Sequence, residues 1–249
     1  LLRTLFWGDI LIFRNSPGPL FLVERKGLEE VFLETPEMYG QERAKFAWCW
    51  KYRVAELIEV AQYDKILFVD ADCLALRNID HLREGDWGIR YQPECGRSGD
   101  GKSFNAFLTE DELAKAADRE GANSGTLAVR ASLFHEVMAK WRAIDESQPL
   151  RASGYRDQAS WNTLLHRNGI GFGLQNNDGG VGKWRAQPFP NGEVQFPGYL
   201  NPHYSEYTKA ALTHNILPDT KEKIEFTFGL YMRTFFCDPS GLFFSMLEM

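Results

Sequence analysis

Two carboxylates separated by one residue stand at the end of an apolar run, in the segment Lys65-Ile66-Leu67-Phe68-Val69-Asp70-Ala71-Asp72. Four consecutive apolar residues are typical of a buried strand in a parallel sheet, and ligands of open α/β folds bind at the carboxyl edge of such a sheet. Two oxygen ligands this close together suit a hard divalent cation, Mg2+ or Mn2+, that keeps open positions for phosphate oxygens. The segment therefore predicts a metal-dependent enzyme that acts on a phosphorylated substrate.

The same acid pair is compatible with a second chemistry. An Asp-x-Asp pair after an apolar strand also resembles the phosphatases and mutases of the haloacid dehalogenase class, in which Asp70 would be the nucleophile and Asp72 the acid. That class normally has its acid pair near the start of the fold, followed by a small polar residue, whereas Cys73-Leu74 follows here. Other segments of the chain must distinguish the two interpretations.

Size, charge and cysteine content limit the classes of protein further. With 249 residues, the chain is long enough for one α/β domain spanning residues 1–249. A formal charge of −6 argues against a nucleic-acid partner, because phosphate backbones require clustered Lys and Arg. No apolar run approaches the roughly 20 residues of a membrane span, and no export signal is recognisable, so we expect a cytoplasmic protein without a membrane span. The scattered cysteines predict neither a zinc site nor a disulfide framework: Cys49, Cys73, Cys95 and Cys237.

Hydrophobic patterns predict strands that alternate with helices. Short apolar runs predict strands at residues 9–13, 31–33, 66–69, 87–92 and 126–130. Apolar residues spaced three and four apart predict amphipathic helices at residues 41–61, 133–141 and 157–166. Because strands and helices alternate, we expect a mostly parallel sheet in an α/β fold.

Five polar segments accompany these elements. They are Lys51 and Arg53 before the acids, Asp70-Ala71-Asp72, Asn123-Ser124-Gly125, Asp157-Gln158 with Asn162, and His214 after Ala210-Ala211-Leu212. Each segment taken alone has an ordinary structural interpretation: a solvated helix face, a turn, a helix N-cap or a structural histidine. Their joint order around a strand-end acid pair favours one shared functional site.

This arrangement resembles the glycosyltransferases of family 8, which include glycogenin and bacterial lipopolysaccharide glucosyl- and galactosyltransferases. In that family a Tyr-Asp-Lys segment leads through an apolar strand to Asp-Ala-Asp, a Leu-rich strand and an Asn-Ile-Asp turn. The matching residues here are Tyr63-Asp64-Lys65, Asp70, Asp72, Leu74, Leu76 and Asn78-Ile79-Asp80. The match covers about two thirds of the chain, and it implies a GT-A-like, doubly wound α/β fold with a mostly parallel mixed sheet flanked by helices.

The resemblance also implies roles for individual residues. Asp70, Asp72 and His214 resemble the family's ligands of Mn2+ (or Mg2+), which would stabilise a departing nucleoside diphosphate. Asp157 and Gln158 resemble its catalytic residues. The residues implied to bind the nucleotide-diphosphate sugar donor are Lys51, Arg53, Ala71, Asn123, Ser124, Gly125, Asn162 and Lys221. The implied reaction transfers the sugar with retention to a hydroxyl of a glycan, lipid or protein.

The chain departs from the family pattern at two places. After His214 the family's glycine is absent and Lys221 comes one position late, which weakens the roles implied for both residues. Before Leu1 the family's first strand and helix are expected to be missing, so the nucleotide base is not predicted. An N-terminally truncated domain is the expectation.

Two further segments allow other interpretations. Gly96-Arg97-Ser98-Gly99-Asp100-Gly101-Lys102-Ser103 fits the phosphate-loop pattern, but that loop should precede the acidic strand, so we interpret it as a loop near the sugar site. Residues 171–202 carry many Gly, Pro and Asn residues together with Trp184, Phe189, Phe196 and Tyr199. If the donor site were inactive, these rings could stack on sugars, as in a glycan-binding module without catalysis.

Overall fold

A computed structural model describes residues 9–14, 28–32, 50–70, 73–97, 107–116, 120–147, 156–168, 184–190, 193–195 and 210–214. Three of the predicted site residues, Ala71, Asp72 and Lys221, lie outside these ranges. Most of the phosphate-loop-like segment and most of residues 171–202 lie outside them as well. Within the described part, no helix has both the length and the apolar character needed to cross a membrane.

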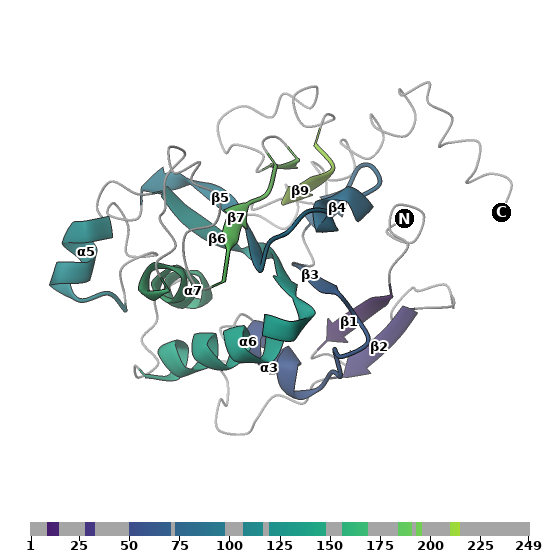
Figure 1. Cartoon of the computed structure of the whole chain (residues 1–249), viewed down its shortest axis with the longest axis horizontal. Helices are drawn as coiled ribbons and strands as arrows, with labels where there is room; N and C mark the ends of the chain where they lie inside the picture. Colours follow the sequence, from purple (N-terminus) through teal and green to yellow (C-terminus); the bar gives the residue numbers. More distant parts are fainter. Residues whose placement is uncertain are drawn as a thin grey trace, which may run out of the picture.

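A four-stranded mixed sheet forms the centre of the described structure (Figure 1). Its order is β3 (Lys65–Val69), β6 (Glu120–Arg130), β5 (Ile89–Arg97) and β7 (Ala186–Pro188). β6 pairs antiparallel with both β3 and β5, and only β7 runs parallel to its neighbour. The α/β class with a mixed sheet is thus confirmed, but β3 is antiparallel to β6. An apolar run indicates that the faces of a strand are covered, but it carries no information on whether the neighbouring strand runs parallel or antiparallel.

Two smaller sheets flank the central one. β1 (Ile10–Arg14) pairs parallel with β2 (Leu28–Phe32), close to the strands predicted for these segments. The other sheet has the order β4 (Cys73–Ala75), β9 (Leu212–His214) and β8 (Val194–Gln195). β4 and β9 are antiparallel, with Cys73 directly opposite His214. This pairing brings the backbone that follows Asp72 beside the backbone of the predicted histidine ligand.

Two long helices pack beside the sheet (Figure 1). α6 (Ala131–Glu146) starts directly after β6, and α7 (Arg156–Arg167) packs on both α6 and β6. On α6, Leu133 is partly buried and the other four of the five apolar residues predicted to share one face are buried: Phe134, Val137, Met138 and Trp141. Together with residues of β5, β6 and α7, they form the main hydrophobic core. Two shorter elements are α5 (Glu110–Ala116) and the 3-10 helix η4 (Asp80–Arg83).

The predicted helix over residues 41–61 ends earlier in the structure, at Glu56. Within the described residues it comprises α3 (Trp50–Arg53) and the 3-10 helix η3 (Val54–Glu56), and residues 41–49 are outside the described part. The backbone N–H of Leu57 donates to the carbonyl of Val54, which closes the last turn, and Leu57 is 50% exposed. Apolar residues continue at helical spacing beyond Glu56 in the sequence, which is why a longer helix was predicted. In the structure, the side chains of Ile58 and Val60 reach the core from irregular backbone instead.

Gly88 lies where β5, β6 and the segment before β7 converge. Its N–H donates to the carbonyl of Arg185 (3.2 Å), and its carbonyl accepts from the N–H of Arg130 (2.8 Å). A Cβ at this position would stand 2.0 Å from the carbonyl oxygen of Trp184 and 2.8 Å from a methyl group of Leu133. Backbone atoms cannot move aside as a flexible side chain can, so this approach requires glycine.

We therefore expect Gly88→Ala to lower the free energy of unfolding by about 3 kcal/mol or more, because overpacking against fixed backbone is costly. Gly85→Ala is the matched control. Gly85 has a positive φ of 92°, but a Cβ there meets nothing closer than 3.4 Å, so the substitution should cost only about 1–2 kcal/mol. Urea unfolding of both variants measures the difference. Equal losses would contradict the steric interpretation.

Candidate active site

The Asn123-Ser124-Gly125 segment is an irregularity within β6. On the β5 side, Tyr91 is paired with Leu127 but the next residue, Gln92, is paired with Asn123, so β6 has three extra residues between these pairs. On the β3 side, Val69 still pairs with Thr126, and the N–H of Asp70 donates to the carbonyl of Gly125 (2.7 Å). Bulges of this kind redirect side chains and are common beside active sites. The segment is therefore part of a strand rather than the simple turn that its composition also allowed.

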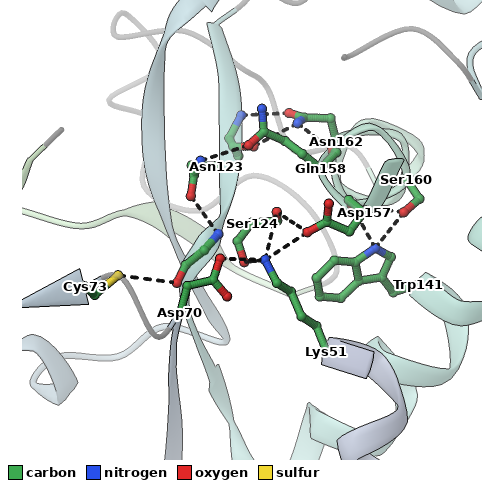
Figure 2. Close-up of polar contacts among 12 residues, drawn as sticks. Lys51, Asp70, Cys73, Asn123, Ser124, Trp141, Asp157, Gln158, Ser160 and Asn162 are labelled. Atoms are coloured by element: carbon green, nitrogen blue, oxygen red, sulfur yellow. Dashed lines mark hydrogen bonds and ion pairs between the residues drawn. The ribbon is translucent and has the colours of Figure 1, made fainter. Parts of the chain in front are cut away.

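The Lys51 ammonium joins the end of β3 to the start of α7 (Figure 2). Its Nζ lies 2.8 Å from Asp70 Oδ2 and 2.8 Å from Asp157 Oδ2. It also donates to the carbonyl and hydroxyl of Ser124, at 3.3 and 3.4 Å. Lys51 is only 7% exposed and Asp157 only 5%. Three of the predicted site segments, which are far apart in the sequence, thus meet around one buried cation.

The charge of this lysine follows from its surroundings. Burial by itself lowers the pKa of Lys51, but the adjacent carboxylates of Asp157 and Asp70 outweigh burial and raise the pKa above its ordinary value of 10.5. A raised folded-state pKa means that the interaction stabilises the fold fully below the unfolded value and is lost only as the pH rises through the folded one. Lys51 therefore remains a cation throughout the neutral range.

The first turn of α7 faces the bulge of β6. Ser124 Oγ donates to Asp157 Oδ2 (2.7 Å), and the Asn123 amide donates to Gln158 Oε1 (2.8 Å). Asn123 Oδ1 in turn accepts from the N–H of Gly125 (2.6 Å), which fixes the orientation of the amide. Asp157 lies inside the first turn, after Arg156, and its carboxylate binds Lys51 and Ser124 across the site. The N-cap interpretation of Asp157 is therefore not the arrangement found.

Asn162 lies one turn further along α7 and is directed at the strand backbone. Its Oδ1 accepts from the N–H of Ala122 (2.7 Å), and its Nδ2 donates to the carbonyls of Ala122 and Gln158, both at 2.8 Å. An amide side chain that bonds both the N–H and the C=O of one residue imitates a neighbouring strand. Asn162 thus holds α7 against β6 immediately before Asn123.

The structure separates Arg53 from Lys51, although both lie on α3. Arg53 Nη2 is 3.1 Å from Glu146 Oε1, at the end of α6, in an exposed ion pair. Lys51 instead reaches Asp70, so of the two basic residues it is the one that the structure brings to this strand-end acid.

The metal side of the predicted site is described only in part. The side chain of Asp70 is 27% exposed, whereas Asp72 lies outside the described residues and only the backbone of His214 is described. Among the described side chains, no three metal-ligating groups come together. The described donors are of types that fit a hard divalent cation: Asp70 carries a carboxylate at the strand end, and the pairing of Cys73 with His214 brings the backbone of a histidine beside the start of β4.

Two residues beside the site, Trp141 and Gln92, were not predicted from the sequence as site residues. Trp141 donates its indole N–H to Ser160 Oγ (2.8 Å) and to the carbonyl of Asp157 (3.2 Å). Gln92, opposite Asn123, is fully buried, and neither polar atom of its amide has a hydrogen-bond partner among the described residues. A lone Gln in a predicted strand and a Trp on an apolar helix face do not indicate a site in the sequence. Their roles depend on which residues of other elements lie next to them in the fold.

The Lys51 contacts predict that replacing Lys51 destabilises the fold more than replacing Arg53, which lies on the same helix. Lys51→Met should lower the free energy of unfolding by about 3 kcal/mol or more, because it leaves a buried carboxylate without its cation. The control Arg53→Met removes an exposed ion pair and should cost less than about 1 kcal/mol. Denaturant unfolding at pH 7 measures both. Similar losses for the two variants would show that Lys51 is not the buried link described above.

We compared the chain with known protein families, sequences and structures. No protein-family model matches the chain. A curated relative, a putative UDP-glucuronate:xylan alpha-glucuronosyltransferase 4 of Arabidopsis thaliana, is 27% identical over 107 residues, which cover 39% of this chain and 17% of that protein. The matched region therefore spans less than a fifth of the relative's length.

Solved structures match over most of the chain. The bifunctional glycosyltransferase WbbM in its apo form superposes with a TM-score of 0.50 at 12% identity, covering 83% of this chain and 41% of that one. The galactosyltransferase LgtC, solved with donor and acceptor sugar analogues, gives a TM-score of 0.47 at 14% identity, covering 82% and 76% of the two chains. The resemblance predicted from the sequence is thus confirmed for the fold: the chain has the GT-A-like fold of glycosyltransferases.

Proposed function

We propose that the chain transfers a sugar from a nucleoside-diphosphate donor to a hydroxyl acceptor, with retention and with the help of Mn2+ or Mg2+. The observation that carries the proposal is the meeting of Asp70, Lys51 and Asp157 at the edge of the sheet, next to the bulge of β6. The glycosyltransferase fold and the name of the curated relative, which specifies a UDP-linked sugar, support a nucleotide-sugar donor.

The cation would be held by Asp70, Asp72 and His214. Two carboxylates and an imidazole leave coordination positions open for diphosphate oxygens. Once bound, such an ion supplies Lewis acidity that offsets the charge of the leaving nucleoside diphosphate. The Lys51 ammonium, held against Asp70, adds a fixed positive charge to the same region. Ala71 lies between the two acids, and in this proposal its backbone borders the donor.

The donor sugar would be held by the polar groups of the bulge and of α7. Amides and carboxylates can match both the donor and the acceptor capacity of a sugar hydroxyl. Asn123 and Gln158 already orient each other, and the adjacent Gln92 amide is buried without a partner among the described residues, which is where a polar ligand or ordered water is expected. Ser124 and Gly125 would present the bulge backbone, whereas Asn162 would act by fixing α7 to β6.

In the transfer itself, positive charge develops on the sugar ring as the bond to the diphosphate breaks. The Asp157 carboxylate and the Gln158 amide oxygen are the groups proposed to stabilise that charge. The acceptor hydroxyl attacks from the face that the diphosphate leaves, and a diphosphate oxygen takes its proton, so no separate protein base is required. Arg53 and Lys221 are proposed only as additional contacts to donor phosphates. The acceptor is a hydroxyl of a glycan, lipid or protein.

The test is nucleoside diphosphate release from a panel of nucleotide sugars, with Mn2+ and with EDTA. We expect release that EDTA abolishes, and a loss of at least about 100-fold in Asp70→Asn, Asp72→Ala and His214→Ala, because each removes a proposed metal ligand. Asp86→Asn is the control, since Asp86 is exposed and lies in a surface ion pair with Arg130.

Three kinds of outcome would contradict the proposal. Release that is insensitive to EDTA, or unchanged in Asp72→Ala, would exclude the metal-dependent mechanism. Release of inorganic phosphate from a simple phosphate ester would favour the haloacid dehalogenase-type phosphatase. Glycan binding without any donor turnover, retained in Asp70→Asn, would favour a binding module.

A further inference from the structure

The described part of the helix that carries Lys51 is the four residues of α3. Four residues alone do not form a stable helix in water, so tertiary contacts contribute to holding this segment in place. Tyr52, the neighbour of Lys51, is 3% exposed and donates its hydroxyl to Asp145 Oδ2 on α6 at 2.8 Å. Both partners are buried, so this contact is well shielded from water.

One turn earlier on α6, Trp141 contacts the other side of the site. Its ring packs edge-on against Tyr52, with centroids 5.8 Å apart at 65°. Its indole N–H donates to Ser160 Oγ and to the carbonyl of Asp157, and Ser160 Oγ itself donates to the Asp157 carbonyl (3.0 Å). In Figure 2 the indole N–H points at the first turn of α7, toward Asp157 and Ser160. A single turn of α6 therefore contacts both of the segments that Lys51 and Asp157 come from.

These contacts form a closed ring. Lys51 binds the Asp157 carboxylate, Trp141 binds the Asp157 carbonyl and Tyr52, and Tyr52 is covalently next to Lys51. In such a ring the separation of the Lys51 ammonium and the Asp157 carboxylate is set by where α6 places Trp141 and Asp145. Because the three elements belong to distant parts of the chain, no local feature could set that separation.

We propose that Trp141 and Asp145 are positioning residues: they act through Tyr52 and the first turn of α7 to hold Lys51 and Asp157 in register for sugar transfer. The inference rests on the proposed function for its kinetic consequence, but its structural part can be tested without turnover. Both act through other groups, Trp141 through the backbone carbonyl of Asp157 and Asp145 through the hydroxyl of Tyr52, so they are positioning residues rather than catalytic ones.

The structure provides a matched control for Trp141. Trp161, on α7, is fully buried and packs against the ring of Trp141, with the two ring centroids 4.8 Å apart. Its indole N–H nevertheless has no hydrogen-bond partner among the described residues. Trp→Phe at either position removes a similar volume from the same core. Only Trp141→Phe also removes the hydrogen bonds to α7. The difference between the two variants therefore measures the effect of these hydrogen bonds separately from the effect of lost packing volume.

The first measurement is independent of activity. The 15Nζ resonance of the Lys51 ammonium, assigned by its loss in Lys51→Met, reports the geometry of its ion pairs. We expect Trp141→Phe and Ser160→Ala to shift or broaden this resonance and Trp161→Phe to leave it near its original position. An unchanged Lys51 signal in Trp141→Phe, at a stability equal to that of Trp161→Phe, would overturn the inference whether or not the chain transfers sugar.

The second measurement applies once a donor is turned over. We expect Trp141→Phe to reduce kcat at least about 10-fold with a smaller change in the donor KM, Asp145→Asn to lower kcat in the same direction, and Trp161→Phe to change kcat less than about 3-fold. In a Lys51→Met background, Trp141→Phe should cause no further loss, since residues that act as one unit are not additive. Independent, multiplicative losses would overturn the inference. Absence of turnover with a shifted Lys51 signal would instead refute only the proposed function.

Discussion

The candidate site depends on one interaction, the buried ammonium of Lys51 between the carboxylates of Asp70 and Asp157. A buried charge is costly unless it is paired and hydrogen-bonded, and here both carboxylates and Ser124 satisfy the ammonium. The three partners come from the end of β3, the bulge of β6 and the first turn of α7. The Asp157 carboxylate is buried and would be poorly solvated without the cation, so the elements are interdependent: displacing Lys51 leaves that buried charge without its partner.

β6 is the element against which the other parts of the site are arranged. It pairs with β3 on one side and β5 on the other, and its bulge inserts three residues that have no partner in the β5 register. At this bulge Asn123 and Ser124 contact α7, while Asn162 anchors the same helix to the regular strand just before it. A rigid sheet and a rigid helix are thus joined by short, directional hydrogen bonds. Such a framework can present polar groups to a ligand without reorganising first.

The sequence predicted the parts of the fold whose signals are local. α6 and α7 follow from apolar residues at helical spacing, and β1, β3 and the end of β6 follow from short apolar runs. The predicted long helix before β3 was wrong beyond Glu56, because Ile58 and Val60 reach the core from irregular backbone while Leu57 stays half-exposed. The predicted parallel neighbour of β3 was wrong for a related reason. Burial of a strand's faces leaves a pattern in its residue types, whereas the direction of its partner depends on the route of the chain.

What the sequence determined by itself was which residue types are present and in what order: an acid pair at a strand end, an amide-rich Asn-Ser-Gly, an Asp-Gln pair at a helix start and a later histidine. Only the tertiary structure decided between Lys51 and Arg53, directed Asp157 across the site rather than to its own helix end, and gave Trp141 contacts with two other elements. The physical reason is that ion pairs and hydrogen bonds act over a few ångströms in space. Their partners here lie tens of residues apart, where no sequence spacing records them.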